Sequence, residues 1–204
     1  MKVNNLVPAT CPEPEVVRTI PSIQDQFSQQ IPADLAFFIR DHADEITRMN
    51  KEHRSVGQWT LLGEGVSKAV YSHPEEPNYV FKIPHGKRFI DMFLRHFENM
   101  GKAAKLIKAN RWKRLQAPED AYLINSSFLF CIERKMEFER HWRVAETPAK
   151  KEAIDQLQAF LRETGICDID ITLKGGNAEF LKGTEDNPKI AIYDFDCKKN
   201  PRPY

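Results

Sequence analysis

The sequence has no apolar run long enough to cross a membrane, and its amino terminus lacks the basic and apolar segments of a secretory signal peptide. It also has little cysteine. The four residues, Cys11, Cys131, Cys167 and Cys197, form no C-x-x-C pair, so neither a disulfide framework nor a zinc site is expected. A reducing cytoplasm suits such scattered thiols. No membrane association is predicted.

An excess of charge of either sign is also missing. Thirty Lys and Arg residues stand against 29 Asp and Glu residues, which leaves a net charge of +1 and no global attraction to nucleic acid. Trp112 and Trp142 lie beside basic residues, but core or interface packing explains them better than base stacking. The sequence does not reveal the oligomeric state, and a monomer is the expectation. The function must come from a local site.

What the chain does have is enough apolar material for a core, with 41% hydrophobic and 10% aromatic residues in 204. Residues 1–32 are polar and carry five prolines, which predicts a disordered leader, possibly a secretion signal. An accessory helix is predicted over residues 33–55, where apolar residues recur at helical spacing. Strands are predicted over 59–62, 69–72 and 79–83, as an antiparallel meander.

The remaining pattern alternates helices and strands. A long helix is expected from about Ile90 to Ile107, then strands over 121–124 and 127–132. A further helix is expected over 148–163, closed by Gly165, and the last forty residues indicate a loop, a strand, a turn and a strand.

The first group of residues suited to chemistry is Gly63-Glu64-Gly65, which lies between the first two predicted strands. Lys82 lies on the third predicted strand, residues 79–83. Glycines allow backbone N–H groups to close over phosphates, but a tight hairpin also uses glycine, so this pattern is ambiguous by itself. Lys82 strengthens it. A charge between apolar residues on a strand is costly to bury unless a phosphate or carboxylate is its partner.

Two acidic groups follow later in the chain. Asp168 and Asp170 come after the expected helix end at Gly165 and precede Lys174 and Asn177. Alone, such a loop is most often a solvated turn. The second group is the apolar strand Lys189-Ile190-Ala191-Ile192-Tyr193, which ends abruptly in Asp194-Phe195-Asp196. Two carboxylates at the end of a buried strand favour a bound metal or cation.

In this chain order the groups resemble the protein-kinase superfamily over roughly residues 56–198. The resemblance implies ATP and Mg as cofactors. It matches Gly63 and Gly65 to the first two glycines of the phosphate loop, with Lys68 in place of the third. It also implies that Val70 packs on adenine and that Lys82 contacts the α- and β-phosphates.

The resemblance also assigns the remaining site residues. Glu98 is the expected helix partner of Lys82, with Asp91 as the fallback. Asp170 is the expected catalytic base and Asp168 takes the position of the family's histidine, although which of the two acts as base stays open. Lys174 would neutralise the transferred phosphoryl group. Asn177 and Asp194 would hold Mg.

Three departures from the family pattern are present. Asn177 stands seven residues after Asp170, where the family has five, and Asp196 replaces the final glycine of D-F-G. Eight residues follow Asp196, too few for an activation segment or an A-P-E motif. This reduction resembles the minimal type III effector kinases of the HopBF family. That likeness implies injection into a host cytoplasm and phosphorylation of a host protein, possibly a heat-shock chaperone.

The predicted architecture is therefore α+β and bilobal. Residues 56–133 form an amino-terminal lobe with a five-stranded antiparallel sheet and one long helix, and residues 134–204 form a strongly reduced helical lobe. The expected activity is transfer of the γ-phosphate of ATP to a Ser or Thr of a protein. A nucleotide-binding pseudokinase and a kinase-fold AMP transferase remain alternatives. The six histidines show no metal-ligand spacing and are interpreted as structural: His42, His53, His73, His85, His96 and His141.

Overall fold

The computed structural model describes residues 31–109, 111–118, 120–125, 128–139, 147–166 and 177–195, together with the backbone of residues 15 and 16. A large antiparallel sheet has the strand order β1-β6-β7-β4-β3-β2, and a small sheet has the order β5-β9-β8. The strands are β1 (Glu15–Val16), β2 (Thr60–Glu64), β3 (Lys68–His73), β4 (Glu76–Pro84), β5 (Leu115–Gln116), β6 (Ala121–Asn125), β7 (Leu129–Arg134), β8 (Ala178–Phe180) and β9 (Ile190–Ile192). The helices are α2 (Ala33–Asp41), α3 (Ala43–Glu52), α4 (Ile90–Lys108) and α5 (Pro148–Thr164), with a short 3₁₀ turn over Lys87–Phe89.

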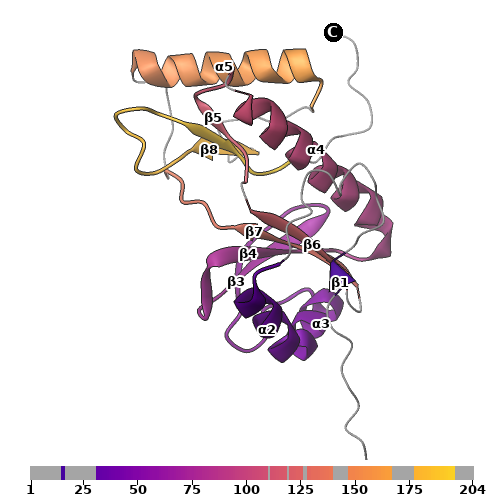
Figure 1. The fold of residues 1–204 in the computed structure, drawn as a ribbon. Coiled ribbons are helices and arrows are strands. Elements are labelled where there is room, and N and C mark those ends of the chain that lie inside the picture. Colours follow the sequence, from indigo (N-terminus) through magenta and orange to yellow (C-terminus); the bar gives the residue numbers. More distant parts are fainter. Residues whose placement is uncertain are drawn as a thin grey trace, which may run out of the picture.

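The large sheet separates two apolar cores. Because successive side chains of a strand point to opposite faces, Phe81 and Ile83 of β4 pack toward α2 and α3, while Lys82 points to the other face. Strand β7 repeats this pattern, since Phe130 and Ile132 join the α2–α3 core and Cys131 joins the core of α4. In Figure 1 helices α2 and α3 lie below the large sheet. The opposite face is therefore left for α4 and for a site.

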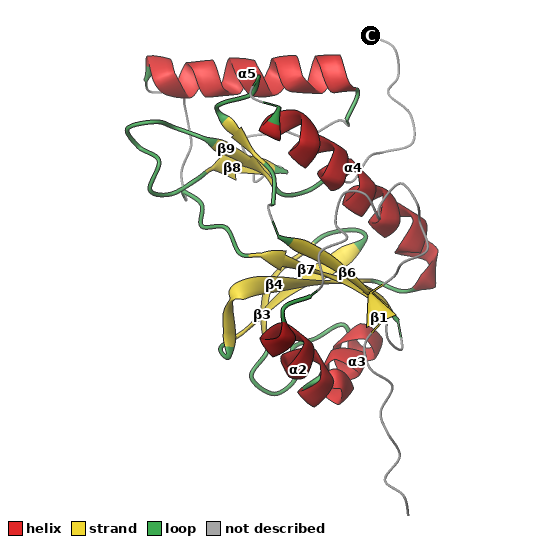
Figure 2. Cartoon of the chain, viewed as in Figure 1, coloured by secondary structure: helices red, strands yellow, loops and turns green. Residues whose placement is uncertain are grey.

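Helix α4 connects the large sheet to the rest of the molecule. It runs from the edge of this sheet to the small sheet, over which α5 lies (Figure 2). Phe93, Phe97 and Met100 of α4 are buried in one cluster with Leu157 and Phe160 of α5. Burying a large apolar side chain contributes about 2 kcal/mol, so this cluster ties the two parts together.

Several expected elements are confirmed. Five antiparallel strands, β2, β3, β4, β6 and β7, and the long helix α4 appear as the sequence predicts. Helix α5 begins at Pro148 after Thr147, whose side chain accepts a hydrogen bond from the Lys150 backbone N–H. It ends at Gly165, which has a φ of 61°, a left-handed conformation that favours glycine. No helix in the described part of the chain is long and apolar enough to cross a bilayer.

Other boundaries differ from the expectations. The accessory helix over 33–55 is two helices, α2 and α3, separated at His42. Within the leader over 1–32, Glu15 and Val16 form strand β1, which pairs with β6 and extends the large sheet. The carboxyl-terminal part contributes two strands, β8 and β9, to a three-stranded mixed sheet whose third strand, β5, comes from before residue 134 and pairs in parallel with β9. Two-residue strands such as β1 and β5 give too short a pattern to recognise in a sequence.

Candidate functional site

A cavity of about 570 Å³ lies against the face of the large sheet that carries Lys82. This volume suits a small ligand. Its lining combines residues from both parts of the molecule, including Gly63 and Gly65 from the β2–β3 hairpin and Met136 from the segment after β7. Asn177 and Asp194 line it from the carboxyl-terminal part. The cavity therefore brings together pieces of the chain that the kinase resemblance groups by function.

Sheet register places four of the lining residues on one face. Lys68 and Val70 are two apart on β3, Val70 pairs with Lys82 on β4, and Lys82 pairs with Cys131 on β7. Glu133, two residues after Cys131, is the diagonal neighbour of Lys82 on that same face. The strand period of two thus delivers two lysines and one glutamate to the cavity.

Lys82 is buried and makes an ion pair with Glu133, whose Oε2 lies 2.7 Å from the Lys82 Nζ. The ammonium also donates to the Tyr193 carbonyl oxygen at 2.8 Å. Burial by itself raises the pKa of Glu133, but the charge of Lys82 and the hydrogen bond from His96 outweigh it and lower this pKa to about 2. Glu133 is therefore ionised at neutral pH, and its buried charge has the Lys82 ammonium as its partner.

The expected partner of Lys82 on the long helix was Glu98, and this expectation is wrong. Among the described residues the carboxylate paired with Lys82 is that of Glu133, and Asp91, the fallback, is exposed at the start of α4. The helix residue that faces the site is His96. Residues two apart on an α-helix point about 200° away from each other, so Glu98 faces away when His96 faces the site.

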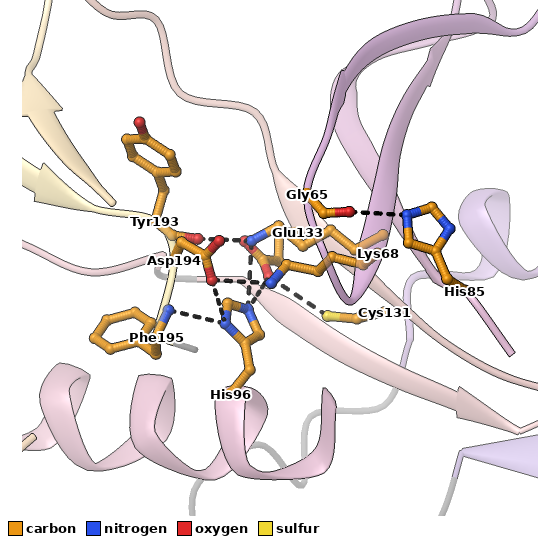
Figure 3. Close-up of polar contacts among 10 residues, drawn as sticks. Gly65, Lys68, His85, His96, Cys131, Glu133, Tyr193, Asp194 and Phe195 are labelled. Carbon is orange, nitrogen blue, oxygen red and sulfur yellow. Dashed lines mark hydrogen bonds and ion pairs between the residues drawn. The ribbon is translucent and has the colours of Figure 1, made fainter. Parts of the chain in front are cut away.

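His96 has no exposed surface and lies against both acidic residues of the site, with its Nδ1 3.3 Å from Asp194 Oδ1. Its Nδ1 accepts a hydrogen bond from the Phe195 backbone N–H at 3.0 Å, and its Nε2 lies 3.4 Å from Glu133 Oε1. A backbone N–H can only donate, so we assign the ring proton to Nε2, from which it is donated to Glu133. Figure 3 shows His96 between Glu133 and Asp194. The His96 ring thereby holds the backbone at Asp194 and Phe195 in place.

Asp194 is held by Lys68, whose Nζ lies 2.9 Å from Oδ1. Burial by itself raises the pKa of Asp194, but its contact with His96 and the nearby charges of Lys68 and Lys82 outweigh burial and keep the pKa well below its usual range. The backbone N–H groups of Tyr193 and Asp194 both donate to the Asn177 carbonyl oxygen, at 2.9 and 3.2 Å. Asn177 and Asp194 are thus fixed beside each other, and their oxygens are the hard ligands that Mg²⁺ prefers.

The backbone conformation at Gly63 and Gly65 is one that other residue types can also adopt. Among the described residues the glycines with positive φ are Gly57, Gly86, Gly165 and Gly183, so the hairpin does not require glycine at 63 or 65 for its backbone angles. Residue 65 closes the turn by donating its N–H to the Lys68 carbonyl at 2.9 Å. A Cβ added at residue 63 would meet nothing within 4 Å. Missing side chains instead keep this wall of the cavity open for a ligand.

The segment after β7 carries a free backbone edge. The Lys135 N–H donates to Asn78 and the Glu137 carbonyl accepts from Lys182, but Met136 has no backbone hydrogen bond within the described part of the chain. Met136 lines the cavity, as do Val70 and Val80 of the sheet and Phe138 with Tyr193, whose rings lie 4.9 Å apart. An apolar slot with one free amide edge suits a flat heteroaromatic ring.

Apart from Glu98, the sequence-predicted site residues fall into two groups. Gly63, Gly65, Val70, Lys82, Asn177 and Asp194 all line the one cavity. Asp170 and Lys174, with Asp168 and Asp196, lie outside the described residues.

Glu133 and His96 were missed as site residues, and Lys68 was noted only as a replacement. A charged residue inside an otherwise apolar strand was the available signal for Glu133. Searches for related proteins find no matching protein family and no matching curated protein.

Proposed function

We propose that this protein is a minimal protein kinase that binds Mg-ATP and transfers the γ-phosphate to a Ser or Thr hydroxyl of a protein. The observation that carries the proposal is the convergence of Lys82, Asn177 and Asp194 on the cavity beside the open Gly63–Gly65 hairpin. These residues lie far apart in the sequence. A buried lysine and two adjacent oxygen ligands are what binding of a metal-bound triphosphate requires.

The lining residues suggest how ATP is held. Adenine fits between Val70 and Val80 on one side and Phe138 on the other, with the Met136 backbone as its hydrogen-bonding edge. Lys82 is placed to neutralise phosphate oxygens while Glu133 keeps its ammonium in position. Such prearranged charges act on the transferred group without reorganisation, which is the main source of catalysis in phosphoryl transfer.

Asn177 and Asp194 are the residues that would hold Mg, which when bound neutralises charge on the phosphate oxygens. The Lys68 Nζ lies 2.9 Å from Asp194 Oδ1, so Lys68 would contact a phosphate oxygen of a nucleotide whose metal Asp194 would hold. Lys68 begins β3 at the edge of the Gly63–Gly65 hairpin, within reach of both. It is a second positioning cation beside Lys82.

The acceptor hydroxyl needs a base, and the kinase resemblance assigns this role to Asp170, with Lys174 beside the moving phosphoryl group. Both precede Asn177, which lines the cavity wall. Asp168 is the alternative base. The likeness to the HopBF effector kinases supplies the rest of the proposal, namely a host protein as substrate, possibly a heat-shock chaperone, reached by injection into the host cytoplasm.

The experiment is an incubation of the purified chain with candidate acceptor proteins and with α- or γ-labelled ATP in separate reactions. Label from the γ position only, lost in Asp170→Ala and Asp194→Ala, is expected. Label from the α position only would identify an AMP transferase and end the kinase proposal. Nucleotide binding without any transfer, with all variants alike, would identify a pseudokinase instead.

A further inference from the structure

Two histidines and a glutamate, distant in sequence, meet on the face of the large sheet opposite the cavity. His42 stands between α2 and α3, His73 ends β3, and Glu75 lies in the β3–β4 turn. One ligand atom from each lies within 4.8 Å of the other two. The ring centroids of His42 and His73 lie 4.6 Å apart. Because the two histidines are far apart in the sequence, their spacing along the chain gave no sign of this cluster.

The orientation of His42 is fixed by a carboxylate behind it. His42 Nδ1 lies 3.1 Å from Glu45 Oε2, which also accepts a 2.8 Å hydrogen bond from Trp59 Nε1. Glu45 therefore holds the proton of the ring on Nδ1 and leaves the Nε2 lone pair facing the cluster. A carboxylate that hydrogen-bonds the far nitrogen of a histidine is the usual support of a metal-bound imidazole.

The free lone pair of His42 faces another acceptor. Its Nε2 lies 3.4 Å from Glu75 Oε2, so a proton or a metal ion bound to Nε2 would be shared with that carboxylate. Two ligand atoms of a tetrahedral zinc ion, each about 2.0 Å from the metal, are roughly 3.3 Å apart. Among the described residues, no lysine or arginine makes an ion pair with Glu45 or Glu75.

We propose that His42, His73 and Glu75 bind a divalent transition-metal ion, with zinc as the best fit to two imidazoles and a carboxylate. A proton on His42 could bridge Glu45 and Glu75 without a metal, but buried His73 places a third ligand atom within 4.8 Å of the other two. His73 Nδ1 accepts a 3.3 Å hydrogen bond from the Glu75 N–H. A metal on Nδ1 would replace this bond, and a metal on Nε2 would place the ring proton on Nδ1, so binding through either nitrogen costs one long hydrogen bond.

The metal would act as a clip. It joins the break between α2 and α3 to the β3–β4 turn, so the two helices become tied to the sheet that they cover. Glu75 is exposed, which leaves an open path for the ion and room for a water as fourth ligand. The site shares no residue with the cavity, so its test is independent of the proposed kinase activity.

The test is titration calorimetry of Zn²⁺ into the full chain after treatment with a chelator, supported by the visible absorption of bound Co²⁺. One ion per chain with a dissociation constant on the order of micromolar or below is expected, together with a rise in melting temperature. Glu75→Gln, an exposed substitution that leaves the core intact, should weaken binding roughly tenfold or more.

The matched control is His85→Gln. His85 and His53 form another close histidine pair, with Nδ1 atoms 3.5 Å apart, and zinc binding should be unchanged when His85 is replaced. His42→Gln should abolish the Co²⁺ bands. Binding no tighter than millimolar in the wild type would overturn the proposal, as would binding that His85→Gln removes and Glu75→Gln leaves intact.

Discussion

Lys68 Nζ lies 2.9 Å from Asp194 Oδ1, although 126 residues separate the two in the chain. The contact joins the start of β3 to the segment that follows β9, and so it closes one end of the cavity. Lys68 is nearly fully buried and the Asp194 side chain is 26% exposed. The pair therefore stabilises the fold and also occupies the carboxylate that we propose binds Mg.

Lys68→Met is expected to lower the free energy of unfolding by about 3 kcal/mol, because it leaves a largely buried carboxylate without its nearest cation. Urea denaturation measures this. In a double-mutant cycle, Asp194→Asn should cost much less in the Lys68→Met background than in the wild type. Fully additive effects of the two substitutions would mean that the ion pair contributes nothing to stability.

A second prediction compares two residues of α4. His96→Leu removes the acceptor of the Phe195 N–H and the donor to Glu133, so it should cost about 2–3 kcal/mol of stability and weaken nucleotide binding. Glu98→Gln, two residues along the same helix, should change stability by less than about 0.5 kcal/mol. Denaturation and nucleotide titration of both variants check this. A larger effect of Glu98→Gln would restore the helix glutamate as the functional residue.

Residues that belong to sequence motifs were predictable, whereas residues placed by contacts between distant strands and helices were not. The order of motifs along the chain grouped Lys82, Asn177 and Asp194, and these three residues line one cavity. Glu133 was missed since its pairing with Lys82 depends on the register of β4 against β7, which no local pattern contains. His96 was missed because a histidine within the apolar stripe of a helix has the same sequence pattern as a core residue.

A third prediction concerns the apolar slot of the cavity. Val80 is half-buried and lines the cavity, so the larger side chain of Val80→Phe should fill the slot. ATP binding should weaken roughly tenfold or more, which corresponds to a loss of about 1.4 kcal/mol. Stability should change little, since the added ring enters open space. Val66→Phe is the control, because Val66 is 82% exposed in the loop between β2 and β3. Equal affinities of the two variants for a fluorescent ATP analogue would place adenine elsewhere.

The last prediction follows from the lowered pKa of Glu133. An unfolded glutamate has a pKa of 4.5, whereas the charge of Lys82 and the hydrogen bond from His96, acting against burial, bring the folded value to about 2. A carboxyl group with a lowered folded pKa contributes stability that is complete above pH 4.5 and is lost as the pH falls toward 2. The shift corresponds to about 3 kcal/mol.

Glu133→Gln should therefore destabilise the protein most at neutral pH, and the difference from the wild type should shrink as the pH falls from 4.5 to 2. Asp194 titrates in the same direction, but it is present in both proteins, so the difference between them isolates Glu133. Denaturant midpoints across this pH range measure it. Glu137→Gln replaces an exposed carboxylate after β7, and its denaturant midpoints should change with pH in the same way as those of the wild type. If the Glu133→Gln curve is also parallel, the buried carboxylate is not the charged partner that holds Lys82.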